Sequence, residues 1–420
     1  MIKTNKIDEQ KPKTVAIVGA GIIGLCIGLQ LVKRGFQVTL YDPNGVANKC
    51  SFGNAGHFAT EQVFPLANRS LLPKLPKMLL DPNGPLRIEL RYLFKAMPWF
   101  TRFVLNMTQR KQQQLTSALR SLNEPSLAAY ERLLDNSYDV FISSKGSLLT
   151  FENADFNEVE SVKNHYASQG VNVQLLTQQD VLELEPNLSH NIKYALLFKE
   201  VAHSADPHAL CLHLFDEIQS RGGRFIQERV EHISSTTEGE VIKLANNNNA
   251  IFDKVIIASG VWSKSLAKQL GFSVPIDAER GYHSMLNMEN PITRPVASAD
   301  RQFIITPMDN GLRLAGTVEF AGVDAKENHA RATMLLTHAN ALIPATQSQQ
   351  IESTWMGCRP SLPDSLPVIG VSPRNKNIIF AFGHQHLGLT QGAITSELVA
   401  DLLQDIQPSI TLTPYRIDRF

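Results

Sequence analysis

The stretch from Thr14 to Asp42 constrains the fold of this chain more than any other part of its sequence. Its first five residues, TVAIV, are apolar or β-branched, and they run directly into GAGIIG at residues 19–24. GxGxxG spacing turns a buried strand sharply into a helix, because the first glycine permits the tight turn, the second lets the backbone approach a pyrophosphate, and the third lets the helix pack on the strand. The predicted cofactor contacts of this turn are Gly19, Gly21, Ile22, Ile23 and Gly24.

A second strand and an acidic residue complete this unit. Lys33-Arg34-Gly35 ends the predicted helix with cationic side chains and a glycine, and QVTLY at Gln37–Tyr41 follows as a strand. Asp42 comes next, roughly 20 residues past the glycines, where a carboxylate holds ribose hydroxyls and would repel a 2′-phosphate. We expect Asp42 to bind the ribose of a dinucleotide, with Pro43 and Asn44 in the turn beside it.

The same stretch has an alternative interpretation as a membrane anchor. Residues 14–32 carry no charge and follow a lysine-containing start, so hydropathy alone could assign them to a bilayer. Four glycines and the regular strand-helix-strand continuation favour the dinucleotide-binding unit instead.

Length, charge and cysteine content limit the class of protein. A chain of 420 residues is long enough for two domains, and its 40 basic and 40 acidic side chains cancel, so no nucleic-acid partner is expected. The four cysteines lie far apart without a CxxC pair. This usage predicts neither a disulfide framework nor a metal site, and it favours a cytoplasmic location.

A small, polar, glycine-rich loop follows the predicted ribose-binding acid. Such a loop suits close approach of the backbone to a flat ligand, although it could also be an ordinary connection. We predict further cofactor contacts here, at Ser51, Asn54, Ala55, Gly56 and His57.

The charge and hydrophobic pattern of the sequence change between Leu71 and Lys111. From residue 84 to residue 111 the chain contains six basic side chains and one acidic side chain, Glu89, in an amphipathic pattern around Trp99 and Phe100. A basic amphipathic stretch from Arg87 to Lys111 could contact an anionic membrane surface peripherally, or it could form a helical hairpin that covers the active site. Residues 112–135 are predicted to continue as one helix.

The middle of the chain is predicted to add a helix and strands to the first sheet and then to form a second sheet. Asp206 and Pro207 begin a predicted helix, and a strand over residues 224–230 places Val230 near the adenine of the cofactor. A buried strand from Lys254 ends in small residues, with Ser259, Gly260 and Trp262 as cofactor contacts. Strands predicted at residues 275–288, 301–307 and 312–318 indicate a separate antiparallel substrate domain.

A second glycine-rich strand-to-helix turn lies near the C-terminus. A strand over residues 377–382 leads into GHQHLGLTQG and a helix over residues 393–403, and the predicted contacts are Gly383, Gly388, Leu389 and Thr390. A nicotinamide enzyme normally needs only the first turn, whereas reduced flavin also needs a helix dipole that faces its pyrimidine ring. Two such turns therefore favour FAD as the cofactor over a nicotinamide dinucleotide.

Several motifs together carry a family resemblance. They are VAIVGAGIIGL with Tyr41-Asp42, SFGNAGH at residues 51–57, IIASGVWS at residues 256–263, GCRPSLPDSLPVIG at residues 357–370 and FGHQHLGLTQGAITSELVADL at residues 382–402. The chain resembles the amino-acid-oxidising FAD enzymes of the D-amino-acid oxidase and glycine oxidase superfamily, most closely the D-amino-acid dehydrogenase branch.

This resemblance implies an α/β fold with a Rossmann-like FAD-binding domain of the DAO type and a second, antiparallel-sheet substrate domain. We assign residues 13–83, 200–275 and 350–405 to the discontinuous FAD-binding domain. Residues 84–199 and 276–349 are assigned to the substrate-binding cap domain.

The resemblance also implies oxidative deamination of D-amino acids, cyclic imino acids such as D-proline or cis-4-hydroxy-D-proline included. A hydride would pass from the substrate Cα to flavin N5, and electrons would then pass to a quinone or a carrier. The alternatives are an oxygen-using glycine, D-amino-acid or sarcosine-type oxidase, an RNA-modifying flavoprotein on the same fold, and a non-catalytic NAD sensor.

The candidate catalytic residues are Arg359, His386, Tyr282 and His57. Arg359 presents a planar fork that matches a carboxylate, lies in a proline-rich segment, and matches the carboxylate-binding arginine of the family. Gly357 and Arg359 are also predicted cofactor contacts. Glycine-oxidase-like members carry a further arginine where this chain has His386. His384 and His386 have HxH spacing, but no neighbouring carboxylate or cysteine completes a ligand set, so no metal is predicted.

Overall fold

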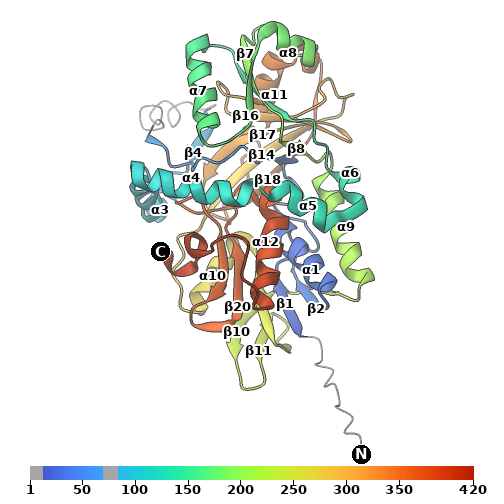
Figure 1. The fold of residues 1–420 in the computed structure, drawn as a ribbon, viewed down its shortest axis with the longest axis vertical. Helices are drawn as coiled ribbons and strands as arrows, with labels where there is room; N and C mark the ends of the chain where they lie inside the picture. The colour runs from blue at the N-terminus through green and yellow to red at the C-terminus, as the bar shows by residue number, and fades with distance from the viewer. Residues whose placement is uncertain (1–12, 70–83) are drawn as a thin grey trace, which may run out of the picture.

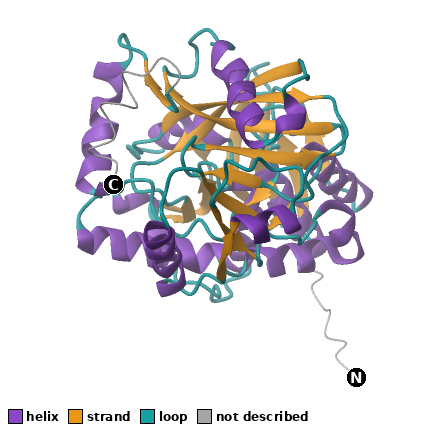
Figure 2. Ribbon diagram, turned by 90° about the horizontal axis from the view of Figure 1, so that it is seen from above, coloured by secondary structure: helices purple, strands orange, loops and turns teal. Residues whose placement is uncertain are grey.

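The computed structural model describes residues 13–69 and 84–420. The polar arm expected over residues 1–13 lies outside this part of the chain except for Lys13, as do residues 70–83 of the predicted FAD-binding domain. Two sheets are stacked along the long axis of the molecule, with the first strands and the last helix in the same half (Figure 1). Figure 2 shows the strands in the middle of the molecule, with most helices around them.

The first sheet has six strands in the order β19-β20-β13-β1-β2-β9. Its strands are β1 (Thr14–Val18), β2 (Gln37–Tyr41), β9 (Arg224–Ile226), β13 (Lys254–Ile257), β19 (Val368–Ser372) and β20 (Asn375–Phe382). All neighbours pair in parallel except β19 with β20. Successive side chains of β1 enter different cores, because Val15 and Ile17 pack on one face and Ala16 and Val18 on the other.

Helices cover one face of this sheet and a small sheet covers the other. The first face carries α1 (Ile22–Lys33), α9 (Pro207–Ser220) and α12 (Gly388–Leu403), whose apolar residues share one core. The second carries α10 (Ser263–Gln269) and the antiparallel strands β10 (Val230–Ser235), β11 (Glu240–Leu244) and β12 (Asn249–Phe252). Asp206 caps α9 as predicted, since its side chain accepts hydrogen bonds from the backbone amides of His208 and Ala209.

The uncharged segment that hydropathy alone could assign to a membrane forms β1 and α1 inside the protein. Nine of the twelve residues of α1 are buried, which explains why the helix carries no charge before Lys33. Among the described residues, no helix is long and apolar enough to cross a bilayer.

The helix predicted over residues 112–135 is instead two helices. α4 (Gln109–Asn123) ends two residues before Pro125, and α5 (Ser126–Leu134) begins directly after it. Proline lacks a backbone N–H and restricts the residue before it, so the continuous-helix prediction was wrong at this position. Both helices contribute leucines to the core that α1 and α12 share, and Figure 1 shows them crossing the middle of the molecule.

The second sheet has nine strands and is largely antiparallel. Eight of them run in the order β18-β14-β17-β16-β15-β5-β7-β6, and β4 pairs with β17. The pairs β15 with β5 and β17 with β4 are parallel. The strands are β4 (Leu86–Ile88), β5 (Ser147–Phe151), β6 (Val173–Thr177), β7 (Tyr194–Phe198), β14 (Asp277–Leu286), β15 (Val296–Ser298), β16 (Phe303–Met308), β17 (Gly311–Phe320) and β18 (Ile351–Ser361).

The helices that accompany the second sheet are α3 (Leu93–Leu105), α7 (Phe156–Ser168), α8 (Gln178–Leu184) and α11 (Ala330–Leu342). α6 (Tyr138–Phe141) and the pair of β3 (His57–Phe58) with β8 (Ala202–His203) contribute instead to the core of the first sheet. The domain boundaries given above remain a prediction. The strand pairing places β18 in the nine-stranded sheet, although residues 350–405 are assigned to the FAD-binding domain.

The contact between Gly24 and the turn before it predicts a stability effect. A Cβ at Gly24 would lie 1.9 Å from the carbonyl oxygen of Gly19, so Gly24→Ala forces α1 away from β1. We expect the free energy of unfolding to fall by about 1–3 kcal/mol, measured by urea unfolding of the apoprotein. Gly388→Ala is the control, because the nearest atom to its added methyl group is 3.8 Å away. Equal midpoints for the two variants would contradict this account.

Candidate active site

The two glycine-rich strand-to-helix turns lie at one edge of one sheet. β13 pairs in parallel with both β1 and β20, so the carboxyl ends of the first and last strands of the unit come together. α1 and α12, which begin after these ends, pack side by side in the same core (Figure 1). This edge of an open parallel sheet is where ligands bind in such folds.

The geometry of the first turn matches the GxGxxG interpretation. Gly19 has a φ of +114°, and a Cβ there would lie 2.5 Å from the carbonyl oxygen of Ala258 on the neighbouring strand. Only glycine combines that φ with that approach. The amide of Ile22, at the start of α1, donates to the Ser51 hydroxyl at 2.9 Å, which ties the glycine-rich loop to the turn.

Asp42 lies against the same turn. Its Oδ2 accepts a hydrogen bond of 3.1 Å from the amide of Ala20, and its Oδ1 accepts one of 2.9 Å from the amide of Asn44. The carboxylate is thereby fixed at the tip of β2, and each of its oxygens keeps lone pairs for a further donor such as a ribose hydroxyl.

A cavity of about 760 Å³ opens between the two turns. The predicted cofactor residues that line it are Gly19, Gly21, Ile22, Ile23, Asp42, Pro43, Asn44, Ser51, Asn54, Val230, Ser259, Gly260, Trp262, Gly357, Gly383, Gly388 and Leu389. They come from both turns, from the loop after β2 and from the ends of β13 and β18, so the fold gathers residues that are far apart in the sequence.

Other predicted residues lie behind or beside this lining, and they are Gly24, Ala55, Gly56, His57, Tyr282, Arg359, His386 and Thr390. Gly24 serves packing, as described above. The Thr390 hydroxyl accepts a hydrogen bond of 2.9 Å from the amide of Ala59, and Gly56 holds a turn with a φ of +73°. Thr390 therefore ties α12 to the loop after β3.

Arg359 is held by a carboxylate on the neighbouring strand. Its Nη1 lies 3.0 Å from Oε1 of Glu279 and 3.5 Å from the carbonyl oxygen of Thr317. The guanidinium lies over Gly281, where a Cβ would be 2.4 Å from its Cζ. Thr317 has a φ of +60°, a strained conformation for a β-branched residue, and such strain is common near functional sites.

The two predicted histidines lie near this ion pair. Burial lowers the pKa of His386 to about 4, the charge of Glu279 opposes this shift, and the charges of Arg359 and His57 add to it. His57 Nε2 lies 3.7 Å from Oε1 of Glu61, and neither His57 Nε2 nor Glu61 Oε2 has a hydrogen-bond partner among the described residues. Arg359, Glu279, His386 and His57 therefore form one electrostatic cluster.

Tyr282 belongs to a separate network. Its hydroxyl donates to Oε2 of Glu319 at 2.6 Å and accepts from the amide of Asn328 at 3.1 Å, while Arg280 pairs with Glu319 at 3.1 Å. Burial, followed by the bond to Glu319, raises the pKa of Tyr282 to about 12. This hydroxyl faces Glu319 and Asn328, whereas Arg359 pairs with Glu279, so the two predicted residues belong to different networks.

The sequence analysis missed Glu279 and Trp355. Glu279 lies in β14, whose ten residues are all buried. A charged residue within a strand predicted from the sequence was the signal that could have pointed to a partner, because a buried charge needs one. Trp355 lines the cavity, stacks on His283 with ring centroids 5.1 Å apart, and packs against Gly53 and Gly357. The only sequence feature that pointed to Trp355 was the pair of glycines, Gly53 and Gly357, which leave room for its ring.

The comparisons with known proteins establish the class of enzyme. The family model described as "FAD dependent oxidoreductase", DAO, matches residues 14–402, and the chain therefore belongs to this family of FAD-dependent oxidoreductases. Within it, the chain is similar to enzymes named for D-amino acids. It is 32% identical to a D-amino-acid oxidase from Bradyrhizobium diazoefficiens, over 97% of this chain and 98% of that protein.

A further relative agrees with this class, and a solved structure has the same fold. A D-amino acid dehydrogenase from Vibrio atlanticus is 26% identical, over 97% of this chain and 99% of that protein. The crystal structure of a glycine oxidase from Geobacillus kaustophilus has a TM-score of 0.76 at 22% identity, covering 97% of this chain and 99% of that one. The predicted fold class and cofactor are thereby confirmed.

The residues of the cavity fit FAD. Glycine backbone at positions 19, 21, 383 and 388 lines it without side chains, and the carboxylate of Asp42 stands at the ribose end of the first turn. The second turn, with Gly383 at a φ of +84° before α12, adds the helix N-terminus that a reduced flavin requires. These residues would hold the cofactor.

Buried neutral histidines at this site predict how stability depends on pH. Burial lowers the pKa of His384 from 6.5 to about 3. As the pH falls below about 6.5, His384 therefore binds a proton in the unfolded chain while it is still neutral in the folded protein. We expect the free energy of unfolding to decrease from pH 6.5 towards pH 3, measured by urea unfolding. Carboxylates titrate in the same range, so the matched variant is His384→Gln, which should lose less stability on acidification. An equal loss in both proteins would contradict the role of His384.

Proposed function

We propose that this protein oxidises D-amino acids, cyclic imino acids such as D-proline or cis-4-hydroxy-D-proline included, and passes the electrons to a quinone or a carrier. The observation that carries the proposal is the position of Arg359. Arg359 lies on β18, the strand whose Gly357, Cys358 and Pro360 line the cavity assigned to FAD, and its guanidinium is paired with Glu279 at 3.0 Å near His386.

The side chains of the cluster suit the binding of an amino acid. Arg359 presents a planar fork for the substrate carboxylate, and Glu279 fixes its orientation at 3.0 Å. Because its pKa is about 4, His386 is neutral at pH 7 and adds no charge to the site. Bound FAD supplies the two-electron acceptor for the hydride of the substrate Cα–H. The resulting imine hydrolyses to a 2-oxo acid and ammonia, or persists as a ring when the substrate is cyclic.

Arg359 and Glu279 also restrict the orientation of a bound substrate. Glu279 Oε2 accepts a hydrogen bond of 3.2 Å from the Ser361 hydroxyl, so both oxygens of this carboxylate are held. A substrate carboxylate that approaches Arg359 must bind to the part of the guanidinium that Glu279 leaves free, and the side chain of Arg359 is 26% exposed.

Two electron acceptors are candidates within this proposal, oxygen and a quinone or carrier. The similarity to a D-amino-acid oxidase at 32% identity favours oxygen, whereas the relatives named D-amino acid dehydrogenase favour another acceptor. We place the protein in the cytoplasm, where its free thiols at Cys26, Cys50, Cys211 and Cys358 would stay reduced.

Anaerobic reduction and aerobic turnover together test this proposal. The purified holoprotein should lose its yellow flavin absorbance when mixed with its D-amino or imino acid substrate in the absence of oxygen, and the L-enantiomer should have no effect. Turnover should then be supported by an artificial dye acceptor with little peroxide release in air. Stoichiometric peroxide would establish the oxidase, and no bleaching by any D- or cyclic substrate would refute the proposed activity.

Substitution of Arg359 tests the carboxylate clamp. Loss of a charge-assisted hydrogen-bonded pair costs about 2–3 kcal/mol, so Arg359→Ala should raise the KM about 30- to 150-fold while the flavin stays bound. Arg359→Lys, which keeps the charge near Glu279 but loses the fork, should lie between Arg359→Ala and the wild type. Arg132→Ala, which removes a surface ion pair with Glu397, is the control. Wild-type kinetics in Arg359→Ala would refute the role of this residue.

A further inference from the structure

We propose that the outer face of α3 docks on an anionic membrane surface. This face carries a row of exposed apolar side chains, here called the α3 stripe. Phe94 is 85% exposed, Leu90 79%, Leu105 64%, Val104 51% and Met97 48%. Intervals of four, three and seven residues place Leu90, Phe94, Met97 and Val104 on one side of the helix and the turn before it, and Leu105 lies next to Val104.

The stripe is not a product of poor packing, because the opposite side of α3 is firmly held. Ala96 is fully buried and Trp99 is 6% exposed. The Trp99 ring stacks on Phe103 and lies 5.0 Å from the ring of Phe320 on β17. The fold therefore uses one apolar side of this helix for its core and leaves a second apolar side in contact with solvent. Contiguous exposed apolar surface of this kind marks an interaction site.

Positive charge lies directly beside the stripe. Arg91, Lys95 and Arg102 follow one another at intervals of four and seven residues, so they share one flank of α3, and all three are exposed. Arg87 precedes the helix. None of these four side chains forms an ion pair with a carboxylate in the part of the chain that the structure describes. Their charge is thus available to an external anion.

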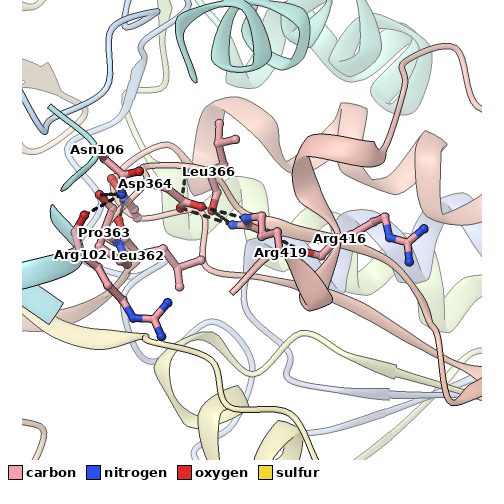
Figure 3. Close-up of polar contacts among 9 residues, drawn as sticks. Arg102, Asn106, Leu362, Pro363, Asp364, Leu366, Arg416 and Arg419 are labelled. Atoms are coloured by element: carbon pink, nitrogen blue, oxygen red, sulfur yellow. Dashed lines mark hydrogen bonds and ion pairs between the residues drawn. The ribbon is translucent and has the colours of Figure 1, made fainter. Parts of the chain in front are cut away.

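A second cavity at the C-terminal end of α3 extends this cationic surface. It has a volume of about 750 Å³ and is lined by Arg102, Leu105, Lys111 and Arg419, among others. Arg419 is bound to Asp364 at 2.8 Å and to the carbonyl oxygen of Leu366 at 2.7 Å, as Figure 3 shows. Arg102 and Lys111 have no such carboxylate partner among the described residues, so they can meet lipid headgroups.

A bilayer with anionic lipids fits this surface better than a second protein does. A helix that lies in the membrane interface buries an apolar side among the acyl chains and keeps basic side chains at the level of the headgroups. The α3 stripe and its cationic flank have this arrangement. The cores of protein interfaces are depleted of charged residues, whereas exposed Arg91, Lys95 and Arg102 lie directly beside the stripe.

The buried side of α3 is connected to the segment that follows Arg359. Trp99 Nε1 donates to the carbonyl oxygen of Ser361 at 3.2 Å. Asn106 Nδ2 donates to the carbonyl oxygen of Pro363 at 3.1 Å (Figure 3). Docking through the outer side of α3 would therefore hold this segment near the membrane. If the proposed function holds, a lipid-soluble acceptor would meet the enzyme on this side.

Vesicle binding by the full-length holoprotein tests the proposal. We expect sedimentation with phosphatidylcholine vesicles that contain phosphatidylglycerol, little sedimentation with phosphatidylcholine alone, and weaker binding at raised salt. The double variant Leu90→Ser/Phe94→Ser should bind the anionic vesicles at least tenfold more weakly. Val140→Ser is the matched control, because Val140 is 75% exposed but lies on α6. Lys95→Gln should weaken binding about fivefold.

Three results would overturn the proposal. They are equal binding to neutral and anionic vesicles, unchanged binding by the double variant, and dimers in sedimentation velocity that the double variant abolishes while vesicles bind neither protein. Turnover with a soluble dye acceptor is measured on the same samples. It separates failure of docking from failure of the proposed function, because neither substitution touches the cavity or the Arg359 cluster.

Discussion

The parallel pairing of β13 with both β1 and β20 is the interaction on which the rest of the structure depends. β13 lies between β1, near the start of the chain, and β20, near its end, so it holds together two segments that are far apart in the sequence. Two glycine turns then share one edge, and α1 and α12 can pack together. Gly24 lets α1 pack closely on β1, since there is no room for a methyl group beside the carbonyl of Gly19. The start of α1 is thereby held at the edge of the sheet where the cavity opens.

The second sheet supplies the polar side chains, and β14 distributes them by alternation. Glu279 points towards Arg359, whereas Arg280 and Tyr282 take part in the network around Glu319. Glu279, Arg280 and Glu319 are buried, and Arg359 is partly buried. Each of these charges is paired, because an isolated charge in such surroundings would cost far more than it contributes. One strand therefore holds the candidate substrate clamp and a separate structural network on opposite sides.

Local signals in the sequence were sufficient for much of the fold. β1 and β2 have the predicted bounds, and α9 begins at Pro207 behind its Asp206 cap, because these features depend on neighbouring residues. The break of the predicted helix at Pro125 was also a local signal, and it was overlooked. Long-range features were not predictable in this way, because the pairing of Glu279 with Arg359 depends on the register between β14 and β18, which pattern alone does not specify. Residue roles at the site remain proposals.

β18 belongs by hydrogen bonding to the nine-stranded sheet, yet its residues 357, 358 and 360 form part of the wall of the cavity at the other sheet. The strands that hold Arg359 through Glu279 and Thr317, β14 and β17, are therefore different from the strands that carry the glycine turns. If Arg359 is the substrate clamp, as proposed above, side chains of β14 and β17 could change without altering the backbone that lines the FAD cavity.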